Sequence, residues 1–418
     1  MPDFYDRYEH RTPGSREASL FRDLRSILSV GKSRTSTLRA QLKGIAIDAL
    51  KTRADLAQIP VMRRSQLRAL QKDLPPFGGA CAKRPGALLR LLVSPDMISY
   101  PEGQGKDWWG AARALFAAGI RKSDIVLSCF SESLIVEPWM IESGARALGV
   151  AIIPARPGNM EFLREVVAHV KPGAFCGDAE NLKACLAKNS ALRSRPTTLR
   201  CALVPGRGVL KTAKEAISAH GIAVFEAYTL GEVGIVAFET VAHEGLIVNE
   251  GLIVEIVKPG TNDPLPDGHV GEVVVTRLNA DYPLLRFGTE DLSAALAGQS
   301  SCGRTNMRLA GFLGNAARPA EIAGKSIDPA AIAEIGKRLP DVGRLRLVVG
   351  SKAPDEVMIL KVESKTDSPW LREKLAHTLQ SVTQLPGRVE IVAPGTLPND
   401  GQIICDERVG RTTESTHA

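Results

Sequence analysis

The sequence predicts an α/β protein with a large N-terminal domain and a small C-terminal α+β domain. Between residues 108 and 226, strand-like runs alternate with helix-like segments of about ten to fifteen residues, a pattern typical of βαβ units and a parallel sheet. Hairpin-like runs follow from residue 245 to residue 276, and about the last one hundred residues mix both patterns. At 418 residues the chain is long for one domain, so a large domain plus a smaller one is expected.

The first part of the chain is predicted to be helical. From Ser15 to about Leu70 apolar residues recur at the spacing that places them on one face of a helix. These residues are Leu20, Leu24, Ile27, Leu28, Leu38, Leu42 and Ile45.

From Trp108 onward strands and helices alternate. The predicted strands are residues 124–129, 150–154, 174–176, 199–205 and 222–226. One predicted helix runs through residues 115–119, and the others are residues 140–148, 160–170, 181–188 and 211–220. Strands separated by helices in this way favour a parallel sheet.

An antiparallel region and the small domain follow. Pro264–Gly268 predicts a turn between antiparallel strands. The regular pattern breaks at residues 314–324, so the predicted domains are a core at 1–313 and a small lid at 314–418. In the lid we expect helices at 329–339 and 368–382, strands at 344–349, 357–362 and 388–392, and a frayed polar tail from residue 412.

Composition narrows the classes of partner. The formal charge of +7 and the pI near 9.0 are compatible with an anionic ligand such as a nucleotide or coenzyme A, but they are explained more simply by basic residues spread over solvated helices. No block of Lys and Arg with interleaved aromatic residues occurs, so no nucleic-acid partner is predicted. Seven cysteines without a CxxC pair indicate free thiols, and no run of eighteen apolar residues occurs. We therefore expect a cytoplasmic protein without a membrane partner.

Chemistry-bearing residues gather in four short motifs. In Tyr282–Asp291 a hydrophobic strand ends in Arg286, Thr289 and Asp291, a crowding typical of a site. The motifs that precede and follow it are Tyr228-Thr-Leu-Gly-Glu232, Gly271-Glu-Val-Val-Val-Thr276 and Cys302-Gly-Arg-Thr305.

Together these motifs resemble the adenylate-forming superfamily, specifically its phenylacetate-CoA ligase-like branch. That branch shows Tyr-Gly-Leu-Ser-Glu, Gly-Glu-Leu-Val-(Phe/Val)-Thr, Pro-Leu-(Ile/Leu)-Arg-(Tyr/Phe)-x-Thr-x-Asp and Cys-Gly-Arg-Thr in this order. The resemblance implies ATP-dependent activation of a carboxylic acid, aromatic by analogy, to an acyl-AMP and transfer of the acyl group to coenzyme A. It also implies Mg²⁺, a mobile lid and a small-molecule acid as partner, and it leaves a homodimer open. The acid would contact the segment from Cys129 to Ile141, whose residues Ser131, Glu132 and Ser133 favour an acid with a polar group.

The resemblance also implies roles for single residues. Asp291 would accept hydrogen bonds from the ribose hydroxyls, and Glu232 would hold Mg²⁺ as a hard oxygen ligand. Tyr228 would stack on adenine, Thr229 would approach the phosphate, and Arg286 would orient the end of the Asp291 strand or reach the nucleotide. Taken alone, each has an ordinary alternative: Asp291 as a turn cap, Glu232 as a solvated loop residue and Tyr228 as a core residue.

The sequence departs from the branch at the places that would bind phosphate and adenine. The expected glycine-rich phosphate loop falls at residues 91–106, where glycine remains at 103 and 105. The adenine-side turn Ser-Gly-Gly is Pro205-Gly206-Arg207-Gly208 here, so Gly206 would lie against the base and Arg207 would crowd it or contact a phosphate.

Gln402 is the departure with the largest consequence for catalysis. It occupies the place of the lid lysine, which bridges the acyl carboxylate and the α-phosphate, and a neutral amide can donate a hydrogen bond but cannot neutralise charge. Two functions therefore stay open: an acyl-CoA ligase that uses Gln402, or a catalytically impaired homologue that binds nucleotide or acyl-adenylate as a sensor or partner subunit. The zinc ligands of some branch members are replaced by Thr240, Ile247 and Ser300, which leaves Cys302 alone, so no zinc is expected.

Overall fold

The structure of this chain is a computed structural model that describes residues 3–95, 97–131, 135–186, 197–206, 211–316, 320–327, 329–352, 355–398 and 403–408. The chain groups into two compact units. Unit 1 comprises residues 1–254, 274–287 and 295–312, and unit 2 comprises residues 255–273, 288–294 and 313–418. The assignment of residues 1–313 to an adenylation core and of 314–418 to a mobile lid stays a prediction.

Five parallel strands form the βαβ part of unit 1, as the sequence predicts. Their order in the sheet is β8-β7-β6-β4-β5, and every neighbouring pair is parallel. Every residue of β6 is buried, which explains why its apolar run shows no alternation. The strands are β4 (Ile125–Cys129), β5 (Ala151–Ala155), β6 (Ala174–Gly177), β7 (Cys201–Pro205) and β8 (Ala223–Leu230).

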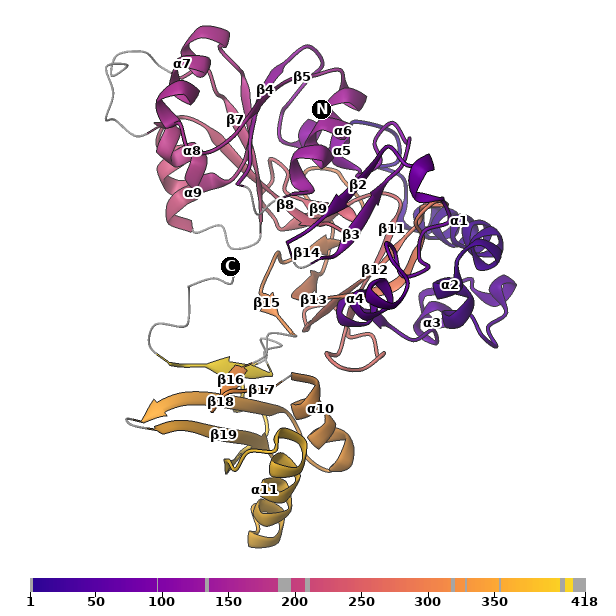
Figure 1. Cartoon of the computed structure of the whole chain (residues 1–418), viewed down its shortest axis with the longest axis vertical. Coiled ribbons are helices and arrows are strands. Elements are labelled where there is room, and N and C mark those ends of the chain that lie inside the picture. Colours follow the sequence, from indigo (N-terminus) through magenta and orange to yellow (C-terminus); the bar gives the residue numbers. More distant parts are fainter. Residues whose placement is uncertain are drawn as a thin grey trace. The chain divides into compact units, whose positions relative to one another are not determined.

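Helices cover both faces of these strands (Figure 1). On one face α7 (Met160–Val170), α8 (Ala179–Leu186) and α9 (Lys211–Ser218) share an apolar core with β4, β6 and β7. On the other face lie α5 (Ala111–Ala117) and α6 (Glu137–Leu148), which pack against each other.

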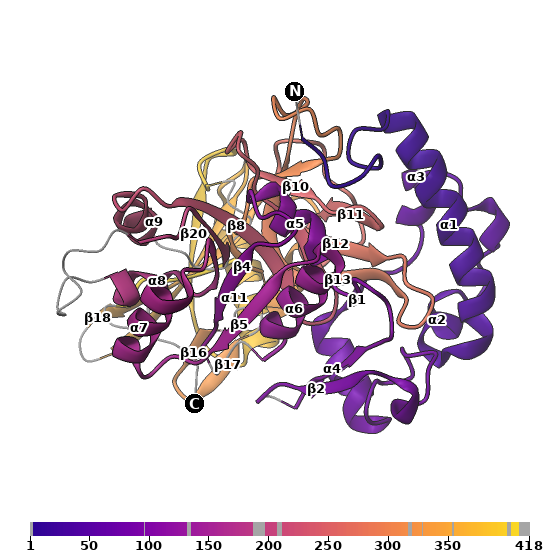
Figure 2. The same ribbon diagram turned by 90° about the horizontal axis from the view of Figure 1, so that it is seen from above.

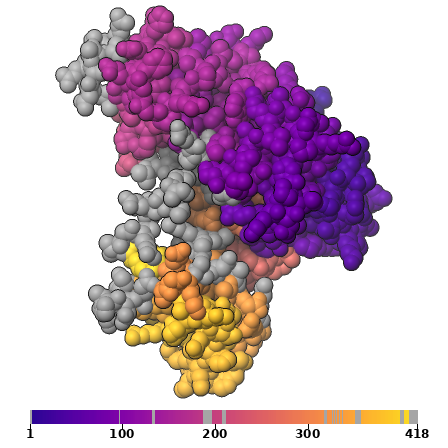
Figure 3. All heavy atoms as spheres, viewed as in Figure 1, coloured from indigo at the N-terminus to yellow at the C-terminus, as the bar shows by residue number. Residues whose placement is uncertain are grey.

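The N-terminal region of unit 1 is helical, as predicted. Its helices are α1 (Pro13–Arg34), α2 (Ser36–Gln41), α3 (Arg53–Ala57) and α4 (Arg64–Asp73), with short 3-10 turns η1 (Ile47–Ala49) and η2 (Pro85–Ala87). The predicted apolar face is the buried one, since Leu20, Leu24 and Leu28 pack with Leu38 and Leu42. Figure 2 shows α1 to α3 at the end of unit 1 opposite α7 to α9. In Figure 3 the indigo N-terminal helices and the purple residues after them form one continuous surface.

The other strands of this sheet follow β8 in the chain, except β1, which precedes it. The thirteen-stranded sheet has the order β11-β12-β13-β14-β10-β9-β8-β7-β6-β4-β5, and β1 and β15 each pair with β13. Their bounds are β1 (Met62–Arg63), β9 (Gly234–Phe238), β10 (Leu246–Val248), β11 (Leu252–Val257), β12 (Val270–Arg277), β13 (Leu284–Leu296), β14 (Arg308–Leu309) and β15 (Gly314–Asn315). The predicted turn at Pro264–Gly268 lies between β11 and β12.

The predicted phosphate-loop segment is a hairpin. β2 (Arg90–Val93) pairs antiparallel with β3 (Ser99–Glu102). At Gly103 an added Cβ would lie 2.3 Å from the Trp108 ring, so tight packing against an indole accounts for this glycine. A phosphate cradle is not needed to explain it.

Unit 2 contains its own four-stranded sheet, with the order β20-β19-β18-β21. Helices α10 and α11 share a core with β18 and β19, next to which they lie in Figure 1. The elements are the β16 (Ala320–Ile322) and β17 (Lys325–Ile327) hairpin, α10 (Pro329–Arg338), β18 (Leu345–Lys352), β19 (Asp355–Glu363), α11 (Pro369–Thr383), β20 (Arg388–Val392) and β21 (Ile404–Asp406). Across the described parts of both units, no helix has the length and apolar character needed to span a membrane.

Candidate functional site

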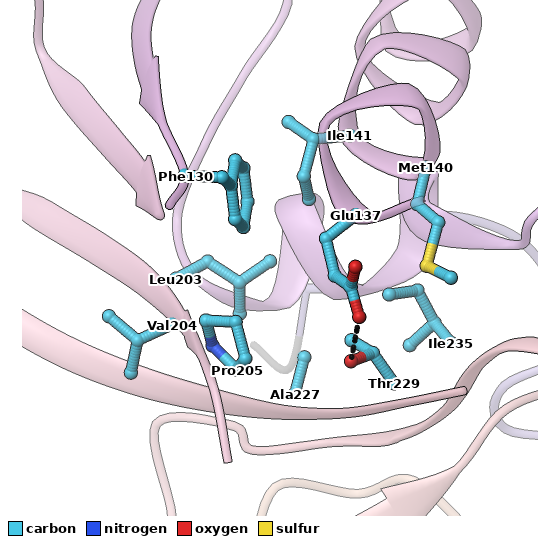
Figure 4. Close-up of a pocket in the computed structure, with 10 residues that line it drawn as sticks. All are labelled: Phe130, Glu137, Met140, Ile141, Leu203, Val204, Pro205, Ala227, Thr229 and Ile235. Atoms are coloured by element: carbon cyan, nitrogen blue, oxygen red, sulfur yellow. Dashed lines mark hydrogen bonds between the residues drawn. The ribbon is translucent and has the colours of Figure 1, made fainter. Parts of the chain in front are cut away.

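A pocket opens in unit 1 at the carboxyl ends of β4, β7 and β8 (Figure 4). In open α/β sheets ligands bind outside the carboxyl ends of the strands, so this is the expected place for a site. Its volume is about 240 Å³, including space open to solvent. The described residues that line it are Phe130, Glu137, Met140, Ile141, Leu203, Val204, Pro205, Ala227, Thr229 and Ile235.

Helix α6 contributes one wall of the pocket. Glu137 is its first residue, and Met140 and Ile141 follow three and four positions later, which places all three on one helix face. The segment from Cys129 to Ile141, predicted to contact the acid, therefore supplies four lining residues. Of its predicted polar residues, Ser131 uses its backbone N–H to donate to Asp178 Oδ2 at 2.6 Å, while Glu132 and Ser133 lie outside the described residues.

Strand β8 contributes the facing wall, and Thr229 is its polar group. The register with β9 shifts between Tyr228 and Thr229, an irregularity that redirects side chains and is frequent near active sites. The Thr229 hydroxyl donates to Glu137 Oε1 at 3.3 Å. Figure 4 shows this contact crossing the pocket between helix and strand. Thr229 was predicted to approach a phosphate, and that role stays a prediction.

Glu232 lies just past β8 and is 1% exposed, so the alternative of a solvated loop residue is wrong. Its carboxylate accepts two hydrogen bonds from Arg64, the first residue of α4: Nε to Oε1 at 2.8 Å and Nη2 to Oε2 at 3.1 Å. Both oxygens thus face a guanidinium, whose positive charge disfavours a metal cation at the same carboxylate. Arg64 was not singled out in the sequence because 168 residues separate the partners.

Arg277 connects the segment around Glu232 to the segment around Trp108 through hydrogen bonds. It donates from Nη1 to the Glu232 carbonyl at 3.1 Å and from Nη2 to the Trp108 carbonyl at 2.9 Å. Its guanidinium lies 4.8 Å from the Trp108 ring centroid, a cation–π distance. Burial lowers the pKa of Arg277 to about 10. Burial is also the main cause of the raised pKa of the neighbouring Tyr282, with the Glu232 charge second, so that phenol stays protonated at neutral pH.

Of the other predicted residues of unit 1, Tyr228 and Gly206 lie near the ends of β8 and β7, and Arg286 lies in β13. Tyr228 is 4% exposed, and Gly206 donates its N–H to the Ala227 carbonyl at 2.8 Å. Arg286 is fully buried with a φ of 44°, and its Nη1 donates to the carbonyls of Ala57 at 2.8 Å and Ile59 at 2.6 Å. These bonds fix Arg286 against the N-terminal helical region. Catalytic participation by Arg286, adenine stacking by Tyr228 and base contact by Gly206 stay predictions.

Asp291 belongs to the part of β13 in unit 2. It is fully buried, its N–H donates to Thr289 Oγ1 at 3.1 Å, and its Oδ1 accepts from Asn315 Nδ2 at 3.4 Å. Thr289 in turn donates to the Val273 carbonyl at 2.9 Å. Asp291 is thus held by its own strand and by β15, and its ribose role stays a prediction. Arg207 and Gln402 lie outside the described residues.

The position of the branch's serine is closed to a side chain. In the branch pattern Tyr-Gly-Leu-Ser-Glu the serine corresponds to Gly231, where an added Cβ would lie 2.8 Å from the Tyr100 ring. Tyr100 therefore fills space that a serine side chain would need. Among the residues whose placement the structure describes, no group of three or more His, Cys, Asp or Glu side chains could hold a metal ion.

Comparison of sequences finds relatives among phenylacetate-coenzyme A ligases. The chain is 26% identical over 362 residues to the phenylacetate-coenzyme A ligase of Aromatoleum evansii. The aligned region covers 81% of this chain and 80% of that protein. The chain is also 26% identical over 335 residues to the Thermus thermophilus enzyme of the same name, covering 76% of this chain and 74% of the enzyme. No family model matches the chain.

Solved structures of 2-hydroxyisobutyryl-CoA ligase share the fold. The one in the postadenylation state with bound R3-HIB-AMP has a TM-score of 0.69 and 23% identity, covering 96% of this chain and 91% of that chain. The one with 2-HIB-AMP and CoA in the thioesterification state has a TM-score of 0.68 and 23% identity, covering 96% and 92%. The chain therefore resembles adenylate-forming ligases in fold and phenylacetate-CoA ligases in sequence, and the resemblance predicted from the motifs is confirmed.

Proposed function

We propose that this protein is an ATP-dependent acid–CoA ligase that activates a small carboxylic acid and transfers its acyl group to coenzyme A. The observation that carries the proposal is the course of β8. Its motif Tyr228-Thr-Leu-Gly-Glu232, which resembles a signature of acyl-CoA ligases, runs directly into a pocket at the carboxyl edge of the parallel sheet. The sequence similarity to phenylacetate-CoA ligases over most of the chain supports the same reaction.

The proposed reaction has two steps. In the first, a carboxylate oxygen of the acid bonds to the α-phosphorus of ATP while the bond to the β-phosphate breaks and pyrophosphate leaves. In the second, the thiol sulfur of coenzyme A bonds to the acyl carbon, AMP leaves and the thiol proton is released. An apolar pocket suits this chemistry because it keeps water away from the acyl-adenylate.

Within this proposal the predicted residues keep their roles: Asp291 at the ribose, Tyr228 and Gly206 at the adenine, and Thr229 near the acid and the phosphate. Glu232 fits a metal poorly while Arg64 holds both its oxygens. We therefore route no step through a metal at Glu232. Arg64 instead brings a positive charge to the place where the resemblance expects a cation, and its guanidinium fork suits phosphate as well as carboxylate.

The second candidate is a non-catalytic homologue that binds nucleotide or acyl-adenylate. Two observations favour it: Gln402 in place of the lid lysine, and a β2–β3 hairpin in place of a glycine-rich phosphate loop. Nucleotide binding is common to both candidates, so binding alone does not distinguish them.

Product analysis distinguishes the two candidates. The purified protein is incubated with ATP, Mg²⁺, coenzyme A and a panel of aryl, aliphatic and amino acids, and AMP, pyrophosphate and acyl-CoA are quantified by mass spectrometry. The ligase proposal expects equal amounts of AMP and acyl-CoA with at least one acid, and strongly reduced product in an Asp291→Ala variant. ATP binding without any AMP or acyl-CoA across the panel would support the binding-protein candidate.

The proposal also covers the location of the protein in the cell and its oligomeric state. We propose a cytoplasmic protein, without nucleic acid or membrane as partner, that forms a homodimer. Sedimentation velocity at micromolar concentration tests the assembly: a single species of about twice the chain mass of 44.8 kDa is expected, and a monomer would contradict it.

A further inference from the structure

We infer that Lys214 is a positioning residue for nucleotide binding, and that it acts through Glu226 on Gly206, the glycine proposed to lie at the adenine. The inference rests on the proposed function and adds to it a residue outside the four sequence motifs. Lys214 belongs to α9, the helix that follows Gly206 in the chain, and in this role it does not touch the nucleotide.

The contacts of Lys214 are the first support. Its Nζ donates to Glu226 Oε1 at 2.7 Å and to Glu239 Oε2 at 3.2 Å. The Lys214 side chain is 25% exposed, and the two carboxylate side chains are 22% and 11% exposed. Burial acts to lower the pKa of Lys214, but the hydrogen bonds and charges of Glu226 and Glu239 outweigh it and raise that pKa above the ordinary value. Lys214 therefore stays charged at neutral pH and bridges two carboxylates that would otherwise repel each other.

The second support is the position of the Glu226 carboxylate. Its Oε1 accepts from Lys214, and its Oε2 lies 3.2 Å from where an added Cβ at Gly206 would be. Gly206 also donates its N–H to the Ala227 carbonyl at 2.8 Å. Because a glycine has more backbone freedom than other residues, its position depends on such neighbours. Lys214 thus fixes the side chain that packs against Gly206.

Glu239 gives the bridge a fixed second acceptor. The Glu226 N–H donates to Glu239 Oε2 at 2.9 Å, and His243 Nδ1 lies 2.9 Å from Glu239 Oε1. The His243 ring stacks on Phe225, with the ring centroids 5.3 Å apart. Both oxygens of Glu239 therefore have partners on β8 or next to it, and Lys214 meets a carboxylate that is already held in place.

Helix α9 is itself fixed on the sheet, which a positioning residue requires. Ala213 and Ile217, on either side of Lys214 in this helix, share an apolar core with Val204 of β7 and Val224 of β8. Lys214 therefore reaches Glu226 from a rigid helix, and the bridge joins that helix to the strand beside Gly206.

A purely structural role for Lys214 must be separated from positioning, because a bridge between α9 and β8 would stabilise the fold without any nucleotide. Lys214→Met keeps most of the apolar stem and loses the charge, whereas Lys214→Arg keeps the charge and the donors. Arg164 provides the matched control Arg164→Met. Its guanidinium joins α7 to α8 on the same face of the sheet, through the carbonyls of Ala184 at 2.6 Å and Cys185 at 2.9 Å.

The experiment measures dissociation constants for ATP and AMP by calorimetry in the presence of Mg²⁺, and kcat and KM in the product assay. We expect Lys214→Met to weaken ATP and AMP, which share the base, by the same factor of about ten or more, since small displacements of a binding group are costly. The KM for ATP should rise likewise, while kcat and the KM for the acid stay within about twofold of wild type. Lys214→Arg should restore most of the affinity, and Arg164→Met should lower the Tm but leave ATP binding unchanged.

Three results would overturn the inference. They are an unchanged ATP affinity in Lys214→Met, a loss for ATP that AMP does not share, and an equal loss in Arg164→Met, which would indicate a general loss of structure. ATP and AMP binding that follows the expectation without formation of acyl-CoA would leave the role of Lys214 standing and count against the ligase reaction. A wild-type protein that binds no ATP would overturn both.

Circular dichroism and thermal melting identify variants that fail to fold. If Lys214→Met fails, Lys214→Gln provides the second test, because it keeps a hydrogen-bond donor and loses the charge. Its loss of ATP and AMP affinity should lie between those of wild type and the Met variant's expected value, and wild-type affinity in Lys214→Gln would overturn the inference.

Discussion

At the scale of single residues, the contacts that define the site join distant parts of the chain. Glu232 was predicted from its motif, but its partner Arg64 and the pocket carboxylate Glu137 were not. Arg64 sits in a short helix with no motif of its own, and the ion pair exists because folding brings α4 beside the end of β8. Local sequence pattern carries no information on such a pair, whereas the motif around Glu232 does.

Removal of Arg64 should destabilise the protein because it leaves Glu232 buried and unpaired. We expect Arg64→Met to cost about 3 kcal/mol, toward the lower end for broken buried pairs because Arg64 itself is 16% exposed. The double variant with Glu232→Met should recover most of this loss. Guanidinium-induced unfolding measures the effect, and Lys72→Met at an exposed position of the same helix should stay within about 0.5 kcal/mol of wild type. If Arg64→Met lowers the free energy of unfolding no more than the control variant does, the ion pair does not stabilise the fold.

We predict that Cys302 is more reactive than Cys129 and Cys201, two other cysteines of unit 1 whose pKa values are shifted. Burial acts to raise the pKa of Cys302, but hydrogen bonds with Ser300, Thr240 and Arg304 together outweigh it and hold the pKa below the ordinary value. Ser300 and Thr240 stand at two of the expected zinc positions. Burial raises the pKa of Cys129 and Cys201 to about 11. Because the thiolate is the reactive form, Cys302 should react at a lower pH than the other two.

Alkylation of the native protein with iodoacetamide between pH 6 and pH 9, followed by peptide mass spectrometry, measures this order. Ser300→Ala should shift the Cys302 profile to higher pH, because it removes a hydrogen bond that stabilises the thiolate. Faster labelling of Cys129 than of Cys302 would contradict the assignment.

At the scale of elements, periodicity predicted the type of most segments and erred where packing overrides local pattern. Strand β8 was predicted to end at Glu226 but continues to Leu230, because the motif residues Tyr228 to Leu230 are buried and pair with β9. The segment at 91–106 could be identified as unlike a glycine-rich loop, yet its hairpin was not foreseen. That hairpin depends on contacts from elsewhere, such as the two hydrogen bonds between Gln71 and Ser99.

At the scale of the whole molecule, the fold was predictable because alternating strands and helices, motif order and chain length all indicate the same architecture. The arrangement of the site residues was less predictable than the fold. Tyr228, Thr229 and Glu232 could be predicted from a motif that covers the last residues of β8 and the turn after it, and Gly206 from the turn after β7. The polarity of the pocket depends on where the first residue of α6 points. The resemblance favours an aromatic acid, and that identity stays a prediction.

The central claim is that this chain adenylates a carboxylic acid, and ATP–pyrophosphate exchange tests it most directly because it reports the first step without coenzyme A. We predict acid-dependent exchange in the wild-type protein, and a rise of about a hundredfold in Gln402→Lys, which restores a charge-assisted donor to the developing negative charge. If neither protein shows exchange with any acid, while both bind ATP in the same preparation, the chain is not a ligase and the account is contradicted.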